Sequence, residues 1–446
     1  MDSALITRIS EQHSRAVRAL PAHLPGTARR RAAAETLACV GLPLGRDENW
    51  RYANLRPLER LTFTPALLGA AEQMPAALRA ADLPPPLPGY ARYVFVDGAF
   101  APPLSAPLDA TAVRVRPLAT APDGRHPGLA DGATRAAGAA DADQRFALLN
   151  EAFATDGAAL AVPAGAGAAA RLELLFLASA DAGLGASYPR IELELEPRAE
   201  LTLVERHASA AAAASFVTSA VTVVLGAGAT LHHYRLQELA PGAILFDTLS
   251  AVLAADAAYR LHGIASGAQS ARATLRVQLA GERADLALAA LALGDRHQVQ
   301  DAFALVEHLA PRTRTEQIFR GIAAGQARVA FNGKIVVARQ AAGTDSRQSL
   351  RGLLAGPQAE IDVRPQLEIY TDEVRCSHGA TAGKLDDDML FYLLARGLEP
   401  ASAQRLLKWA FLGDVFARIG EPELRRGIEQ RLAARMQDGA APGESP

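Results

Sequence analysis

Cys376 and His378 are the residues of this chain whose types and spacing best suit chemistry. They lie two positions apart in V-R-C-S-H-G-A, after a run that alternates apolar and polar residues. On a strand, residues i and i+2 project from the same face, so the thiol and the imidazole would lie side by side. Such a pair can bind iron, zinc or an iron–sulfur cluster. The chain has two cysteines among its 446 residues, the other being Cys39.

Two ligands do not complete a site, because structural zinc and iron–sulfur clusters usually take about four. The remaining ligands would then come from elsewhere, and another chain is one source. Two alternatives stay open. Cys376 could be a buried thiol beside a turn-capping His378. Cys376 could also be a nucleophile with His378 as its base, oriented by Asp372, Glu373 or Asp386.

Other candidate motifs have structural interpretations. The segment Gly379–Leu385 resembles a phosphate-binding loop but has three residues between its glycines and no Ser or Thr after the lysine, so we expect no ATP hydrolysis. The adjacent His232 and His233 would point to opposite faces of a strand and share no metal. Cys39, in an alanine-rich helical segment, reads as an inert core thiol. Trp50 is expected to anchor the N-terminal segment on the core.

The composition is that of a soluble globular protein and excludes several partners. Half of the residues are apolar, 21% are charged, and the net charge is −2. No block of like charge is long enough to bind nucleic acid or anionic lipid. No uncharged apolar run reaches about 18 residues, so nothing is expected to span a membrane. Two cysteines and the lack of a visible secretory signal favour the reducing cytoplasm.

Residues from about 171 to 375 alternate in short runs, as half-buried strands do. A corner pattern recurs mostly at intervals of 26 to 32 residues, as in P-R-A-E-L-T-L, G-A-T-L-H-H-Y and P-Q-A-E-I-D-V. Repeats of this length are typical of stacked coils. Hairpin signals are rare there; Asn332-Gly333 is the exception and could split the run Val329–Val337. The pattern favours a parallel β-solenoid over a β-sandwich or β-barrel.

Helical periodicity occupies both ends of the chain. We therefore expect an N-terminal helical region over residues 1–90, a solenoid core over 91–383, a C-terminal helical domain over 384–436 and a disordered tail over 437–446. The last helices carry a broad apolar face that includes Leu407, Phe411 and Val415. Either the end of the solenoid or a partner protein could cover this face.

The segment from Arg364 to Gly397, which contains E-V-R-C-S-H-G-A-T-A-G-K-L, closely resembles the signature of the SufB/SufD family of iron–sulfur assembly proteins. The similarity continues through Ala403–Val415, and E-N-W-R-Y-A-N-L and F-V-D-G-A-F near the N-terminus also match. Within the family the chain is more similar to SufD. The SufB pattern has glutamate directly after the histidine, where this chain has Gly379, and a cysteine one coil upstream, where Asp345–Leu350 has none.

The resemblance implies a right-handed parallel β-helix between two helical regions. It also implies pairing with a SufB-like paralogue and binding of a SufC-like ABC ATPase through the C-terminal helices, for which we expect contacts from Leu407, Phe411 and Val415. Alone, the chain would form a homodimer. His378 and Cys376 would bind iron or a transient iron–sulfur cluster shared with the partner chain, and no cofactor is expected to bind the isolated chain tightly.

The sequence thus predicts a non-enzymatic, cytoplasmic subunit of a SufB–SufC–SufD scaffold. It would contribute to iron acquisition and to nascent cluster formation at the SufB–SufD interface. An enzyme with a Cys376 nucleophile and a purely structural adaptor for an ATPase remain the alternatives.

Overall fold

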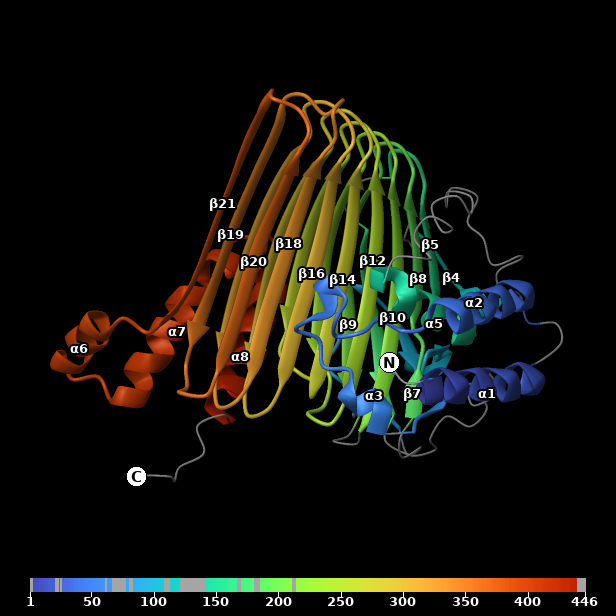
Figure 1. The fold of residues 1–446 in the computed structure, drawn as a ribbon, viewed down its shortest axis with the longest axis horizontal. Coiled ribbons are helices and arrows are strands. Elements are labelled where there is room, and N and C mark those ends of the chain that lie inside the picture. Colours follow the sequence, from blue (N-terminus) through green and yellow to red (C-terminus); the bar gives the residue numbers. More distant parts are fainter. Residues whose placement is uncertain are drawn as a thin grey trace.

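The chain forms a β-solenoid of about 7 turns with helices on both outer faces (Figure 1). The computed structural model describes residues 3–20, 24, 26–60, 62–65, 78–79, 83–107, 113–120, 142–166, 170–179, 185–210 and 214–438. Neighbouring coils pair strand on strand in parallel, so the polypeptide winds through two sheets that face each other. The expected parallel solenoid flanked by helices is confirmed.

Sheet A has the order β20-β18-β16-β14-β12-β10-β8-β5-β4, with β1 and β7 beside that path. Its strands are β1 Thr64–Pro65, β4 Arg114–Pro117, β5 Ala158–Val162, β7 Gly185–Ser187, β8 Arg190–Leu195, β10 Ser215–Leu225, β12 Ile244–Leu253, β14 Ser270–Leu279, β16 Val299–His308, β18 Arg328–Val337 and β20 Glu360–Ile369. The odd-numbered strands β9 to β21 alternate with these strands along the chain and build the opposite wall.

Sheet B has the order β21-β19-β17-β15-β13-β11-β9-β6-β2-β3. Its strands are β2 Ala91–Val96, β3 Ala99–Phe100, β6 Arg171–Ala178, β9 Glu200–Ser209, β11 Thr230–Glu238, β13 Ala258–Ala265, β15 Asp285–Gly294, β17 Arg314–Ala323, β19 Thr344–Leu354 and β21 Val374–Lys384. Ile244 pairs with Ser270 and Arg328 pairs with Glu360, so a coil takes 26 to 32 residues, as the sequence repeat predicts.

The recurrent corner pattern is a tight turn that precedes strands of either sheet, including β9, β11, β13 and β15 of sheet B. In most of these turns one residue has a left-handed backbone, as at Arg198, Asp256 and Arg283, or is a glycine such as Gly228. The residue that follows is small and buried, as Ala229 is, because it fills the inside of the corner. Part of the high alanine content therefore has a structural reason that composition alone did not reveal.

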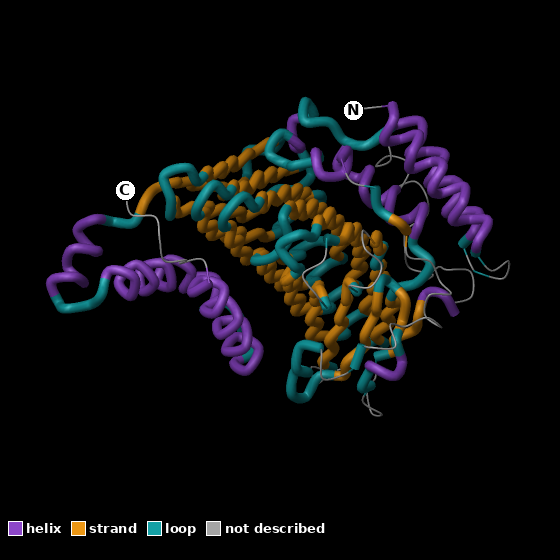
Figure 2. The backbone as a smooth tube through the Cα atoms, turned by 90° about the horizontal axis from the view of Figure 1, so that it is seen from below, coloured by secondary structure: helices purple, strands orange, loops and turns teal. Residues whose placement is uncertain are grey.

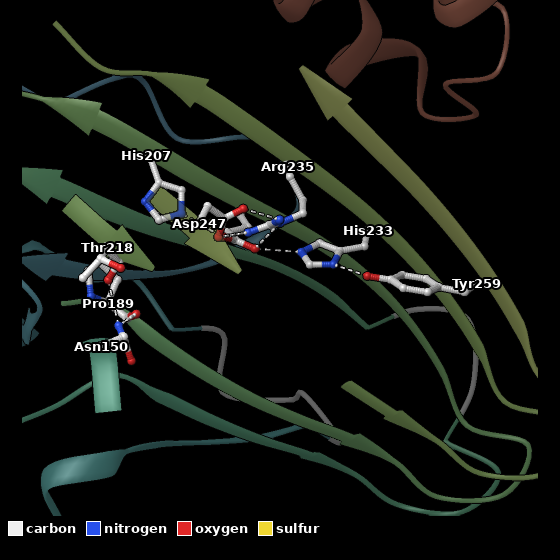
Figure 3. Close-up of polar contacts among 9 residues, drawn as sticks. Asn150, Pro189, His207, Thr218, His233, Arg235, Asp247 and Tyr259 are labelled. Carbon is white, nitrogen blue, oxygen red and sulfur yellow. Dashed lines mark hydrogen bonds and ion pairs between the residues drawn. The ribbon is translucent and has the colours of Figure 1, made fainter. Parts of the chain in front are cut away.

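The helices of the N-terminal half lie on the outer face of sheet A. They are α1 Ser3–Ala19, α2 Thr27–Val40, α3 Arg56–Arg60 and α5 Arg145–Phe153. This half of the chain also has 3-10 turns at Glu48–Trp50, Leu118–Thr120 and Ala142–Gln144, and one at Pro102–Leu104 that packs near β2 of sheet B. Asn150 donates to the carbonyls of Pro189 and Thr218 at 2.8 and 2.7 Å, which ties α5 to sheet A (Figure 3). Trp50 is buried and donates to Asp143, so the expected anchor is present.

The C-terminal helices are α6 Asp387–Ala395, α7 Pro400–Phe416 and α8 Pro422–Asp438. The second half of α7 and α8 pack on the outer face of sheet B through Leu412, Val415 and Leu432. They lie on the opposite side of the solenoid from the N-terminal helices (Figure 2). The Asp386 side chain caps α6, and Gly397 follows the helix with a φ of 87°, as the turn signals predict. No helix among the described residues is long and apolar enough to cross a bilayer.

The two ends of the solenoid differ. At the N-terminal end, β3 and β4 pair antiparallel with β2 and β5 and end the parallel stack. At the C-terminal end, β20 and β21 each have one neighbour, so their other edges are unpaired (Figure 1). Most of β21 is exposed. An unpaired edge of this length offers a row of backbone hydrogen-bonding groups to another chain.

Three local expectations need revision. The strand β18 is continuous through Asn332-Gly333, because Gly333 leaves room for a side chain: a Cβ there would lie 2.7 Å from the Gln348 amide nitrogen. Cys39 is exposed, since α2 buries Ala33 and Leu37 and Cys39 lies on the other side of the helix. Helix α8 extends to Asp438, two residues into the expected tail, and residues 439–446 lie outside the described residues.

Candidate functional site

Cys376 and His378 lie on the same face of β21, the last strand of sheet B. Cys376 pairs in register with Ser346 of β19, and His378 pairs with Gln348. Cys376 packs against the core of the solenoid, so this face of β21 continues the inner wall of sheet B. Cys376 is half-buried and His378 is exposed. The predicted pair of neighbouring ligands is therefore present at the open end of the solenoid.

The local sequence explains why this segment is an edge strand. Asp372 begins the turn from β20, and its carbonyl accepts from the Val374 backbone N–H at 3.0 Å. Val374 and Cys376 then pack inward on the core. Gly379 and Gly383 present no side chain, and a Cβ at either one would meet nothing within 4 Å. Within the described part of the chain, β19 is the one strand that pairs with β21 and sets its register.

The environment of Cys376 keeps its thiol protonated. Burial is the main cause that raises the pKa of Cys376, and the nearby carboxylate of Asp345 raises it further. A backbone hydrogen bond from Ser346 opposes this shift only in part. A thiol of this kind ionises when it binds a metal, because the cation displaces the proton.

The described part of the chain contains no group of three or more His, Cys, Asp and Glu side chains able to hold a metal ion. Asp386, one of the acids near the pair in sequence, accepts from the Met389 backbone N–H at 2.9 Å as the cap of α6. Cys376 and His378 thus stand together without a third conventional ligand from the described residues. A conventional metal or cluster site needs ligands from outside them.

Large apolar side chains are exposed next to this end. Ile369 and Tyr370, where β20 turns toward β21, are 39% and 56% exposed. On the helices that follow β21, the exposed residues are Met389, Phe391, Tyr392 and Leu406. Helix α6 stands clear of the solenoid (Figure 1). The first group precedes β21 and the second follows it, so two separate sets of exposed apolar side chains flank this edge strand.

The three residues expected to contact an ATPase differ in accessibility. Leu407 and Phe411 are half-buried, and Phe411 packs against the cluster under α7. Val415 is fully buried against sheet B. Val415 therefore holds α7 on the solenoid, while a partner that docks on the present surface would meet Leu406 and the exposed face of α6.

Sequence reasoning missed a buried ionic network in the lumen of the solenoid, centred on Glu205. Figure 3 labels its members His233, Arg235 and Asp247. Arg235 donates to Glu205 and to Asp247 at 2.7 Å each. His233 bonds to Glu205 through Nε2 and to the Tyr259 hydroxyl through Nδ1. The two-residue period places Glu205, His233 and Arg235 on inward rows, but only the pairing of successive coils brings these rows together. His232, next to His233, lies half-buried on the outward side, as the strand pattern predicts.

The chain is similar in sequence to known iron–sulfur cluster assembly proteins. A family model described as SUF system FeS cluster assembly, SufBD core domain, matches residues 176–411. The chain is 32% identical to the iron-sulfur cluster assembly protein SufD of Escherichia coli over 91% of this chain and 92% of that protein. It is 28% identical to a SufBD family protein of Synechocystis over 91% and 90% of the two chains. It is also 31% identical to the chloroplastic protein ABCI7 of Arabidopsis thaliana, over 46% and 43%.

Proposed function

This chain belongs to the SufBD family of iron–sulfur cluster assembly proteins, and we propose that it acts as the SufD-like subunit of a SufB–SufC–SufD scaffold. In this role it contributes to iron acquisition and to nascent cluster formation at its interface with a SufB-like paralogue. One observation carries the proposal: a Cys376–His378 pair on one strand face, at the unpaired end of the solenoid. The chain works in the cytoplasm and catalyses no reaction of its own.

The open end supports an interface with a paralogue. The edges of β20 and β21 offer unpaired backbone groups, and a second solenoid has matching edges. His378 and Cys376 lie at that junction, where ligands from the partner can complete a site for iron or a transient cluster. The same surface would join two copies of this chain when no paralogue is present.

The C-terminal helices support a separate contact with a SufC-like ABC ATPase. Phe391 is 73% exposed on α6, and Leu406 is 50% exposed on α7. These residues, with Leu407 and Phe411 beside them, form the docking surface that we propose. Val415 lies beneath it and transmits movement of α7 to sheet B, because its side chain packs directly on the solenoid.

The central test replaces His378 by alanine in the assembled complex. We expect cluster assembly to be lost while the free energy of unfolding stays within about 0.5 kcal/mol of the wild type, because His378 is exposed. The matched control is His297→Ala, an exposed histidine in the turn between β15 and β16. Normal assembly by the His378→Ala complex would refute the site.

A nucleophilic Cys376 is the competing function, and the second cysteine provides an internal reference. A catalytic thiol would react with an alkylating probe at neutral pH faster than the exposed Cys39. We expect slower modification at Cys376, because burial and Asp345 raise its pKa. Peptide mass spectrometry after timed alkylation compares the two sites in one sample.

A purely structural adaptor is the other alternative. It predicts that the reconstituted complex carries no iron at this interface and that Cys376→Ser and His378→Ala leave its visible absorbance unchanged. If His378 is a ligand at this interface, the His378→Ala complex should lose both the iron and the absorbance.

A further inference from the structure

The inner wall of sheet B changes character in its last three coils. Residues that pair in register from strand to strand form rows across sheet B. In β15, two neighbouring inward rows hold Leu286 and Leu288. From β17 onward these rows hold polar side chains: one row is Thr315, Ser346 and Cys376, and the other is Gln317, Gln348 and His378. Two polar ladders therefore run inside the solenoid and end at the Cys376–His378 pair.

The ladders contain buried polar atoms that lack hydrogen-bond partners among the described residues. Ser346 is 0% exposed and Gln348 is 4% exposed. Neither Ser346 Oγ nor Gln348 Oε1 has a partner in the described part of the chain. A buried polar atom without a partner costs about 1–3 kcal/mol, so a fold that retains two of them beside a candidate site calls for an explanation.

The Gln348 amide is held in a fixed orientation. Its Nε2 donates to Gln317 Oε1 and to the Gly333 carbonyl, both at 3.1 Å. Gly333 is required for this arrangement, since a Cβ there would lie 2.7 Å from Gln348 Nε2. Nε2 is thus engaged by β17 and by the opposite sheet, whereas Oε1 is buried without a partner among the described residues and is free to accept a ligand.

We propose that Ser346 and Gln348 complete, with Cys376 and His378, a four-donor site on this chain for a divalent transition-metal cation. The four residues form two register pairs on adjacent strands, Ser346 with Cys376 and Gln348 with His378. Strands lie about 4.8 Å apart and residues i and i+2 about 6.6 Å apart, distances that these side chains can span to one cation. The biological role of the site rests on the function proposed above.

The donor set selects the class of cation. One thiolate, one imidazole and two neutral oxygens suit Fe²⁺ and its neighbours in the first transition series better than Mg²⁺ or Ca²⁺, which prefer all-oxygen ligands. Neutral oxygen donors add no charge, so the site would hold the cation weakly enough to release it. Cys376 and His378 are then part of a site that can bind the cation before a partner chain contributes ligands of its own.

The test titrates the isolated full-length chain with Co²⁺ under anaerobic conditions and follows the thiolate-to-metal charge-transfer absorbance. The wild type should bind with a thiolate band. Ser346→Ala and Gln348→Leu should each weaken binding about tenfold or more. The matched control is Thr315→Val, which removes a buried hydroxyl of the Ser346 row one coil further inward and should leave Co²⁺ affinity unchanged.

A second variant keeps the proposal testable if the first ones unfold. Ser346→Cys preserves the size of the side chain and should strengthen both binding and the charge-transfer band, because a second sulfur replaces an oxygen at the cation. An unchanged band in Ser346→Cys would overturn the site, as would wild-type Co²⁺ affinity in a folded Ser346→Ala, Gln348→Leu double variant.

These outcomes separate the inference from the proposed function. If the folded double variant binds Co²⁺ as the wild type does while His378→Ala stops cluster assembly, only the four-donor site fails. If the double variant loses Co²⁺ but the His378→Ala complex still assembles clusters, the site stands and the proposed function fails.

Discussion

Glu205 is a carboxylate buried in the lumen, and its neighbours keep it charged. Burial by itself would raise the pKa of Glu205, but Arg235 and the hydrogen bonds from His207 and His233 shift the pKa well below its ordinary value. Asp247 shares the same guanidinium. The network borders a cavity of about 100 Å³ lined mainly by apolar side chains. A buried ion pair of this kind is costly to break, since removing one partner leaves a charge without compensation.

His308 gives a pH prediction at the same scale. Burial lowers the pKa of His308 to about 4, whereas an unfolded histidine titrates near about 6.5. Because the folded state binds the proton less readily, His308 reduces stability as the pH falls through this window. The loss at pH 5 is about 2 kcal/mol. Urea unfolding at both pH values checks this prediction. Between pH 7 and pH 5, the free energy of unfolding of the wild type should fall by about 2 kcal/mol more than that of His308→Gln.

The control for His308 is His297→Gln, since His297 is exposed. It should leave the pH dependence of unfolding as in the wild type. Burial is also the main cause that lowers the pKa of His262 to about 4. His262 is present in the wild type and in both variants, so it adds the same pH dependence to all of them. Equal pH dependence in wild type and His308→Gln would contradict the assigned burial.

At the scale of elements, α7 has two parts with different roles. Its second half is fixed to sheet B by Leu412, which is fully buried, and by an ion pair from Asp414 to Arg320. Arg418, just after the helix, adds an ion pair to Glu316. The Arg418 carbonyl also contacts His262 Nε2 at 3.0 Å. Its first half and α6 expose apolar side chains. The sequence presents one apolar face along α7, and only its contact with sheet B divides that face into a buried part and a free part.

This division predicts opposite effects for two truncations. Leu412→Ala should lower the free energy of unfolding by about 2–5 kcal/mol, because it leaves a cavity in the cluster between α7 and sheet B. Phe391→Ser should change it by less than about 0.5 kcal/mol, since Phe391 is exposed. Calorimetric titration with the proposed SufC-like ATPase measures the affinity of each variant. Phe391→Ser should bind the ATPase much more weakly than Leu412→Ala does. A strong binding loss confined to Leu412→Ala would place the docking surface elsewhere.

At the scale of the whole molecule, the solenoid is asymmetric. Its N-terminal coils are ended by antiparallel strands and covered by α1, α2 and α5, whereas its last coil has free edges. Repeat architectures need a covered terminal unit, because an uncovered coil leaves core side chains and backbone groups exposed. In the function that we propose, the paralogue or a second copy would supply that cover.

An added charge tests this surface. Ala382 is exposed on β21, so Ala382→Glu should leave the isolated chain as stable as the wild type to within about 0.5 kcal/mol. In an interface the carboxylate would be buried without a partner, and we expect association to weaken at least about tenfold. Sedimentation equilibrium, alone and with the paralogue, measures this. The same change at the exposed Ala32 on α2 is the control, and an equal effect there would argue against the open end.

The sequence by itself determined the solenoid, its helical ends and the Cys376–His378 pair, because strand alternation, helix capping and the corner turns are local properties that residues and spacing encode. The tertiary structure alone decided which distant rows meet. It placed Ser346 beside Cys376 and Gln348 beside His378, although about thirty residues separate each pair. It also exposed Cys39 and buried Val415. Register between coils depends on the length of every intervening turn, so no single segment carries it.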